Sequence, residues 1–209
     1  LDTGRIVWVA HGRSQACLRG FWRRLRLAKA KIQAVAMDLG AAYWRAVRDN
    51  LPRAAVVFDK FHVVKLVNER LDEVRRQLVR KAEQDLKADI KGTRFLLLSR
   101  RNNLTPEKMC ALDAALRANQ PLFAAYYLKE ELLLLWAQPT AKDMRHFLKS
   151  WCRRALETGL APFKSLVKTL RSRRKGILEW FNHRINSGRM EGINNKVKVM
   201  TRSAYGYRD

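Results

Sequence analysis

Two aspartates each follow directly on a short apolar run, and a third acid lies on a predicted helix near the other end of the chain. Asp38 follows Ile32–Met37, Asp59 follows Ala54–Phe58, and the third acid is Glu191. Carboxylate oxygens at converging positions are the ligands that Mg²⁺ and Mn²⁺ prefer. The chemistry of the chain therefore depends on which of these acids the fold brings together.

Glu191 belongs to a polar stripe of a helix predicted over Gly188–Arg202, which Ser187 can cap. At about 100° per residue, the stripe also holds Asn195, Lys198 and Arg202, while Met190, Ile193, Val197 and Met200 form the opposite face, which we expect to pack. One interpretation is an ordinary surface helix with a ladder of side-chain contacts. The other is that Glu191 completes a metal site while Lys198 and Arg202 hold phosphates.

The two aspartates sit in a strand–helix–strand pattern over residues 32–62. Gly40 precedes a helical period in Tyr43, Val47 and Leu51, and Pro52 ends that helix because proline lacks an N–H. Two buried strands joined by such a helix form a parallel crossover unit, and ligands gather at the carboxyl ends of its strands. We therefore expect Asp38 and Asp59 to lie close together.

The rest of the chain is predicted to be mostly helical. A strand is expected at Ile6–Val9 after a turn at Asp2–Gly4, and a long helix with one apolar face is expected from about Val63 to about Lys91. Every segment of Gly92–Gly176 has a helical pattern, so we interpret it as an all-α insertion in an α/β fold. A turn followed by a strand is half a hairpin, so we expect the sequence to be a fragment that lacks the preceding strand.

Composition indicates a polyanionic partner. Lys and Arg number 43 against 19 Asp and Glu among 209 residues, a formal net charge of +24, and hydrophobic residues make up 47%. Nucleic acid is the expected partner. An acidic membrane surface is a weaker candidate, because the basic residues are spread over many helices and are not gathered beside one amphipathic anchor. No apolar run approaches the ~20 residues of a membrane span. Three isolated cysteines and the lack of a secretory signal favour a cytoplasmic protein.

Three segments of the chain together resemble a known family. They are AVAMD with the following Tyr43, VVFDKFHVVKLVN, and WFNHRINSGRMEGINNKVKVMTRSAYGYRD. In this order and separation they resemble the DDE transposases of bacterial insertion sequences, in particular the ISL-three branch. The resemblance implies an RNase H-like core, a mixed sheet with flanking helices, interrupted by an all-α insertion. It divides the chain into a first part of the core (1–91), the insertion (92–176) and a final core helix with the third acid (177–209).

The resemblance implies three acids that bind two Mg²⁺ or Mn²⁺ ions. Asp38 matches the second acid and Glu191 the third. The first should lie on the strand before the Asp2–Gly4 turn and has no match, since Asp2 is a turn residue and not a strand residue. Two of three ligands should bind metal poorly, which leaves open whether this chain is an active enzyme. Asp59 is either an auxiliary carboxylate or the cap of the following helix, and His62 either orients DNA or Asp59 or is structural.

DNA contacts are expected near the last helix. The candidates are Lys198, Arg202, Asn195, Arg189 and His183, with Asn182 beside His183; Trp180 and Phe181 either stack on a flipped base or pack in the core. The implied partners are the terminal inverted repeats of the element, target DNA and further copies of the protein. The implied location is the nucleoid of a bacterial cytoplasm.

Three hypotheses follow. The first is a truncated, metal-dependent DNA strand transferase, the second is a non-catalytic basic helical module that binds DNA, and the third is a degenerate transposase remnant. Metal binding at Asp38 and Glu191 separates the first from the second, whereas salt-dependent DNA affinity is expected for both.

Overall fold

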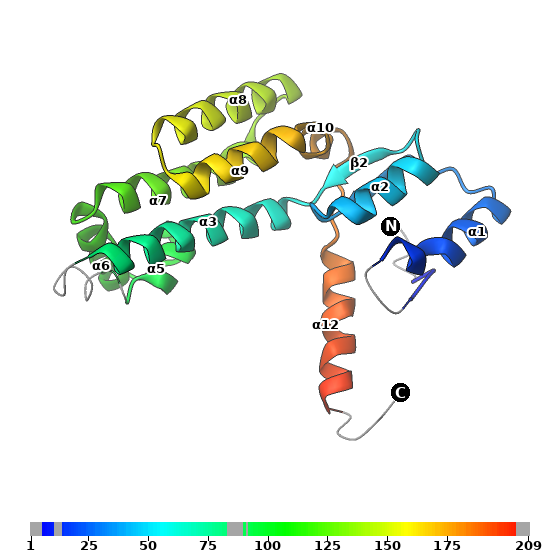
Figure 1. Cartoon of the computed structure of the whole chain (residues 1–209), viewed down its shortest axis with the longest axis horizontal. Helices are drawn as coiled ribbons and strands as arrows, with labels where there is room; N and C mark the ends of the chain where they lie inside the picture. Colours follow the sequence, from blue (N-terminus) through cyan, green and yellow to red (C-terminus); the bar gives the residue numbers. More distant parts are fainter. Residues whose placement is uncertain (1–5, 11–13, 83–89, 91, 204–209) are drawn as a thin grey trace.

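The computed structural model describes residues 6–10, 14–82, 90 and 92–203, and most of these are helical (Figure 1). The helices are α1 (Arg19–Leu27), α2 (Ala41–Asn50), α3 (Lys60–Lys81), α5 (Arg94–Leu98), α6 (Pro106–Arg117), α7 (Gln120–Leu132), α8 (Ala141–Glu157), α9 (Ala161–Ser172), α10 (Arg174–Leu178), α11 (Trp180–His183) and α12 (Gly188–Ser203). Short 3₁₀ segments are η1 (Gln15–Leu18), η2 (Arg101–Asn103) and η3 (Leu133–Ala137). The prediction of a mostly helical chain with some strand is confirmed, whereas the RNase H-like core stays a prediction.

The predicted strand–helix–strand unit is present. Strand β1 (Ala34–Met37) pairs in parallel with β2 (Ala55–Phe58), with Met37 opposite Phe58, and α2 connects them. Helix α2 ends at Asn50, just before Pro52, as the missing N–H of proline predicts. Because the paired strands end in register, Asp38 and Asp59 follow at neighbouring positions of one sheet edge, where the Asp59 N–H donates to the Met37 carbonyl at 3.0 Å.

Helix α3 carries the predicted apolar face. Val63, Val67, Leu71 and Val74 are buried at helical spacing. Helix α3 packs against α5, α7 and α9, and we call α3 and α5–α9 the helical block. The helix begins at Lys60 rather than Val63 because the Asp59 side chain caps it, and it ends at Lys81. The remainder of the predicted helix, toward Lys91, falls largely on residues outside those described.

The main core lies where α3 meets α7 and α9, with α8 packed on α9 (Figure 1). Its largest fully buried side chain is Trp151 of α8, whose indole N–H donates to the carbonyl of Leu128 in α7 at 2.9 Å. Thr140 caps α8 as its sequence position indicates, accepting from the Asp143 N–H at 3.0 Å. Between residues 92 and 178 the described chain contains helices and no strand. The domain boundaries themselves stay a prediction.

Helix α10 joins the helical block to the sheet through a glycine. A Cβ on Gly176 would lie 2.5 Å from Cδ2 of Phe58 and 2.9 Å from the carbonyl oxygen of Val56. Only a residue without a side chain allows α10 to approach β2 this closely. The block therefore packs directly against the strand that ends at Asp59.

Two expectations are wrong. Ile6–Val9 is not a strand, since within the described ranges nothing pairs with its backbone, and Ile6, Val7 and Val9 are exposed. The apolar face of α12 does not pack either: Met190, Val197 and Met200 are exposed, Met200 by 70%. Helix α12 projects away from the other described helices (Figure 1), so the amphipathic period forms a helix without a surface to cover it.

None of the helices in the described ranges has the length and apolar character required to cross a membrane.

Candidate functional site

Asp38 ends strand β1 at a tight turn. Its Oδ1 accepts a hydrogen bond from the Gly40 N–H at 2.9 Å, and a Cβ on Gly40 would lie 2.7 Å from the same oxygen. Glycine thus leaves room for the carboxylate to fold back over the start of α2. Asp38 is partly exposed, and only this one hydrogen bond to its carboxylate is observed in the described chain, so its oxygens remain accessible for a ligand.

Asp59 ends strand β2 and is buried, with 1% of its surface exposed. Its Oδ1 accepts from the Phe61 N–H at 2.9 Å, which caps α3. Its Oδ2 accepts from the Ser187 N–H at 2.7 Å and from the Ser187 hydroxyl at 2.6 Å. Burial raises the pKa of Asp59, but the hydrogen bonds from Ser187 and Phe61 outweigh burial and lower the pKa below its usual value.

Helix α12 begins at this buried carboxylate. Gly188 starts the helix directly after Ser187, and the Glu191 N–H donates to the Ser187 carbonyl at 3.1 Å. The side chain of Asn186 accepts from the Gly188 N–H at 3.0 Å. Ser187 was expected to cap the helix with its hydroxyl; the hydroxyl instead donates to Asp59, and Asn186 supplies a local acceptor.

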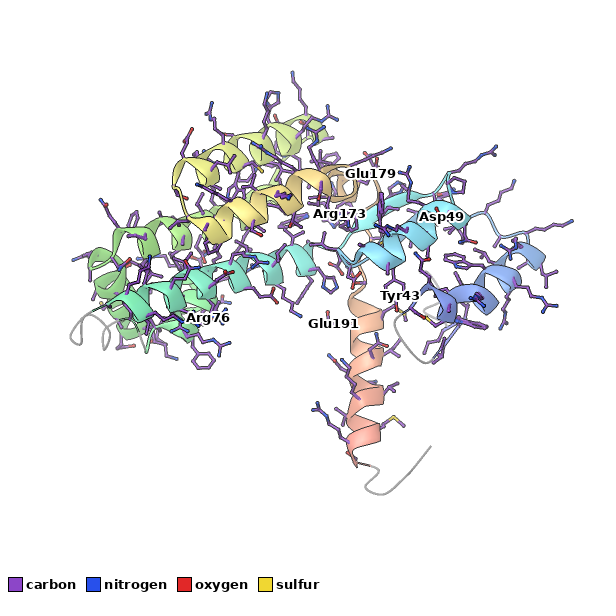
Figure 2. The ribbon with its side chains drawn as sticks, in the orientation of Figure 1. Tyr43, Asp49, Arg76, Arg173, Glu179 and Glu191 are labelled. Carbon is purple, nitrogen blue, oxygen red and sulfur yellow. The ribbon has the colours of Figure 1, made fainter. Side chains whose placement is uncertain are left out.

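Glu191 is exposed on the first turn of α12 and lines a groove of about 680 Å³. The groove is bounded mainly by α3 and α5, and its lining also includes Phe61, Val64, Lys65, Asn68, Glu69, Asp72, Arg76, Arg94 and Leu98. Figure 2 places Glu191 where α12 leaves the junction of β2 and α3. The third predicted acid thus faces a groove.

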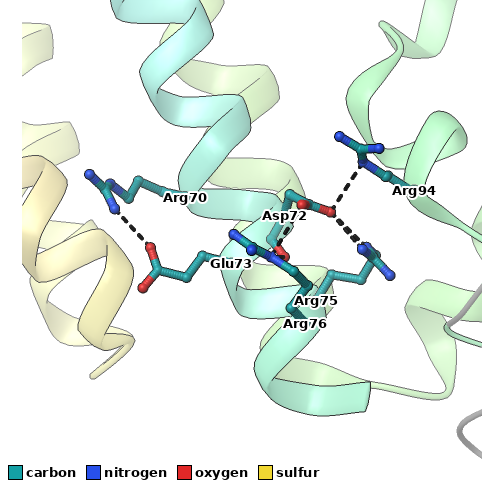
Figure 3. A network of polar contacts seen from close by, with 6 residues as sticks. All are labelled: Arg70, Asp72, Glu73, Arg75, Arg76 and Arg94. Atoms are coloured by element: carbon teal, nitrogen blue, oxygen red, sulfur yellow. Dashed lines mark hydrogen bonds and ion pairs between the residues drawn. The ribbon is translucent and has the colours of Figure 1, made fainter. Parts of the chain in front are cut away.

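One wall of the groove carries a charged network (Figure 3). The Asp72 carboxylate contacts Arg75 at 2.8 Å, Arg76 at 3.3 Å and Arg94 at 3.6 Å. One carboxylate cannot neutralise three guanidinium groups, and the side chains of Arg76 and Arg94 are about half exposed. Arginines with free N–H groups can bind phosphate oxygens, so this wall suits a phosphate backbone. Sequence patterns did not single out these arginines.

The fold brings together the elements that carry the predicted acids. Asp38 and Asp59 occupy neighbouring strand ends, and Asp59 holds the residue one helical turn before Glu191. Asp38 and Glu191 offer the oxygen ligands that Mg²⁺ accepts. In the part of the chain that the structure describes, no group of three His, Cys, Asp or Glu side chains forms a metal site. Two carboxylates fit the chemistry of the metal, and their role as ligands stays a prediction; Asp2 lies outside the described residues.

The residues predicted to contact DNA lie on different helices. Asn195, Lys198 and Arg202 are exposed along α12, while the side chain of Arg189 is outside those described. His183 of α11 lies 3.9 Å from Glu179, and His62 is partly exposed at the start of α3. Trp180 and Phe181 are half-buried against the core, as their packing alternative predicted. The DNA-binding roles themselves stay predictions.

Sequence reasoning missed that Ser187 binds Asp59. The two residues are 128 positions apart, so no local pattern connects them. The only available signal was the interruption of the helical period between α11 and α12. There Arg184 adopts a positive φ of 49°, which ends α11 and redirects the chain toward β2.

Acidification is expected to remove stability through Asp59. Its pKa is lower in the folded than in the unfolded chain, so the carboxylate stabilises the fold above about pH 4, and this contribution is lost as the pH falls through the folded-state pKa. Asp59→Asn should lower the unfolding free energy by about 1.5–3 kcal/mol at neutral pH. Urea unfolding of both proteins at successive pH values tests this: their difference should narrow toward low pH, and a constant difference would contradict it.

Residues 1–209 match the profile of a DDE transposase family of the ISL3 type, described as "Transposase". The chain is similar to the transposase for insertion sequence element IS1001 of Bordetella parapertussis, with 38% identity over 209 residues that cover 98% of this chain and 52% of that protein. The transposases for IS1557 of two Mycobacterium tuberculosis strains share 27% identity over 232 residues, covering 99% of this chain and 52% of theirs. The chain thus spans about half the length of these relatives. No solved structure matches.

Proposed function

Since the chain belongs to the DDE transposase family of the ISL3 type, we propose that it carries part of the centre that cuts and transfers the DNA strands of an insertion sequence. The proposal includes an RNase H-like core around β1, α2 and β2. One observation carries it: Asp38, Asp59 and the first turn of α12 converge on one sheet edge, although the acids come from opposite ends of the chain.

In this proposal Asp38 and Glu191 hold Mg²⁺ or Mn²⁺, two ions in the complete site. When bound, such ions supply Lewis acidity at the attacking and leaving oxygens of a phosphodiester. The partly exposed Asp38 is suited to ligation because its carboxylate makes a single observed hydrogen bond within the described chain. Asp59 is not, because both of its oxygens already accept hydrogen bonds in a buried environment.

DNA is the proposed substrate, as terminal inverted repeats and as target. The net charge of +24 favours a polyanion, and the exposed cations of α12 lie on the same helix as Glu191. Lys198 and Arg202 would hold phosphates two to three turns beyond the acid, with Arg189 and Asn195 nearer to it. Several copies are expected to act together on the two ends of the element, at the nucleoid of a bacterial cell.

A non-catalytic DNA-binding module is the second candidate function. It is favoured by the exposed Lys198 and Arg202 of α12 and the half-exposed Arg76 and Arg94, which can bind phosphates without a metal ion. It predicts salt-sensitive DNA binding with no dependence on divalent metal.

A cleavage assay tests the proposed function. The full-length gene product is incubated with an oligonucleotide duplex that carries the DNA flanking its own gene, with Mg²⁺, with Mn²⁺ or with a chelator. We expect strand cleavage with both metals and none with the chelator, because the reacting oxygens depend on the ions. Electrophoretic mobility shifts on the same duplex provide the control for binding. DNA binding without metal-dependent cleavage would establish the second candidate instead.

A further inference from the structure

The Asp59 side chain connects three elements that are distant in sequence. It ends β2, caps α3 through the Phe61 N–H, and accepts two hydrogen bonds from Ser187 at the start of α12. We call the two bonds to Ser187 the Asp59–Ser187 link. A carboxylate offers about four lone-pair sites, and three donors already occupy Asp59 in a position where only 1% of its surface is exposed. The Asp59 oxygens thus fix the starts of α3 and α12 and are not free to bind a metal ion.

The link matters because α12 has little other support. The helix makes no extensive packing contact with any other element of the described chain, and its apolar side chains Met190 and Met200 are exposed. Figure 1 shows it projecting from the junction at which β2, α3 and α12 meet. Within the described chain, Met190 of the first turn borders a small pocket with Trp8, Leu18 and Phe21, and α12 shares no larger contact with another element. A helix with so few contacts depends on its first residues for its direction.

Glu191 is connected to the link by a single helical turn. Its N–H donates to the carbonyl of Ser187, the residue whose N–H and hydroxyl Asp59 holds. At 1.5 Å of rise per residue, the four steps from Ser187 to Glu191 span about 6 Å along the helix. A small rotation at Ser187 therefore moves the Glu191 carboxylate relative to Asp38 on the neighbouring strand end.

We propose that Asp59 is a positioning residue, whose buried carboxylate fixes the first turn of α12 through Ser187 and so sets where Glu191 stands relative to Asp38. This role rests on the proposed function for its catalytic consequence but not for its structural one. It assigns separate tasks to the two strand-end aspartates: Asp38 faces the ligand, and Asp59 aligns the helix that carries the third acid.

The structural consequence is tested by hydrogen exchange in the full-length protein. Ser187→Ala and Asp59→Asn should each raise amide exchange over residues 188–195 by roughly tenfold or more, since a lost hydrogen bond to a carboxylate changes an opening equilibrium by at least that factor. Thr140→Ala is the matched control, because it removes a hydroxyl at the start of α8, away from the link. It should raise exchange in α8 and leave α12 unchanged.

The catalytic consequence is tested by kinetics on the same proteins. Ser187→Ala should lower kcat for strand cleavage roughly 10²-fold with little change in KM for DNA, because a misplacement near 1 Å costs about that factor. Ser187→Thr keeps the hydroxyl donor and should restore most of the rate. Ser187→Ala removes the hydroxyl bond and keeps the backbone N–H bond, whereas Asp59→Asn weakens both. Asp59→Asn combined with Ser187→Ala should therefore cost little more than Asp59→Asn alone, since the hydroxyl bond is already weakened in that variant.

The outcomes separate the two proposals. If the wild-type protein never cleaves DNA with metal, the proposed function fails while the exchange result still decides the link. If it cleaves DNA and Ser187→Ala retains wild-type exchange in α12 and wild-type kcat, the positioning role is overturned. Fully additive effects of Asp59→Asn and Ser187→Ala would overturn it as well. Ser187→Ala removes one partly exposed hydroxyl, so the test does not depend on Asp59→Asn folding.

Discussion

Replacing Glu191 with glutamine is expected to lower metal-dependent DNA strand cleavage by roughly 10³-fold. A carboxylate that ligates a catalytic ion supports several kcal/mol of transition-state stabilisation, and each 1.36 kcal/mol is tenfold in rate. Glutamine keeps the shape and removes the charge. Because Glu191 is exposed on a helix with little packing, the unfolding free energy should change by no more than about 0.5 kcal/mol.

The matched control for this change is Glu157→Gln. Glu157 is also exposed on a helix, at the end of α8, where it lies 3.7 Å from Arg153 and away from the strand ends. Single-turnover cleavage by the wild type and the two variants should show a lower rate for Glu191→Gln alone. Urea unfolding should give similar unfolding free energies for all three proteins. Equal rates in both variants would remove Glu191 from the proposed site.

Trp151→Ala is expected to produce the largest loss of stability. The side chain is fully buried between α7, α8 and α9, with its ring centroid 6.4 Å from that of Phe163. Emptying such a site costs about 3–5 kcal/mol. The Leu128 carbonyl also loses its indole donor, and the loss of this buried hydrogen bond adds to the cost. Against a typical total of about 5–15 kcal/mol, the variant retains little margin.

Phe95→Ala tests whether burial of the aromatic ring causes the loss of stability expected for Trp151→Ala. Phe95 is an aromatic residue of α5 with 76% of its surface exposed, so its removal should cost no more than about 0.5 kcal/mol. Thermal and urea unfolding followed by circular dichroism measure both variants. Similar losses for Trp151→Ala and Phe95→Ala would mean that the helical block is not packed around Trp151.

Local patterns predicted the elements that carry the acids. The apolar runs before Asp38 and Asp59 became the paired strands β1 and β2, since short buried runs bounded by turn residues have few alternatives. The bounds predicted for the last helix, from Gly188 to Arg202, differ from α12 by one residue. Proline and capping signals worked for α2 and α8 because they act within one turn.

Long-range contacts were beyond the same reasoning. The role of Asp59 was left open between an auxiliary carboxylate and a helix cap. The local bond from the Phe61 N–H confirms the cap, whereas the bonds from Ser187, 128 positions away, were not predicted. The apolar stripe of α12 predicted packing that the described chain does not provide, because periodicity predicts a face and not its partner. Ile6–Val9 failed as a strand for a similar reason, since a strand exists only with a neighbour.

The close approach of Gly176 to Phe58 has a consequence for the order of events during synthesis. Strand β2 leaves the ribosome long before α10 and Ser187, the latter 128 residues beyond Asp59. At about 5–20 residues per second, roughly 6–25 s separate the strand from the partners that cover it. During this interval the Phe58 ring lacks its glycine neighbour and the Asp59 carboxylate lacks its serine. The junction that holds the third acid therefore closes only after the whole helical block and Ser187 have left the ribosome.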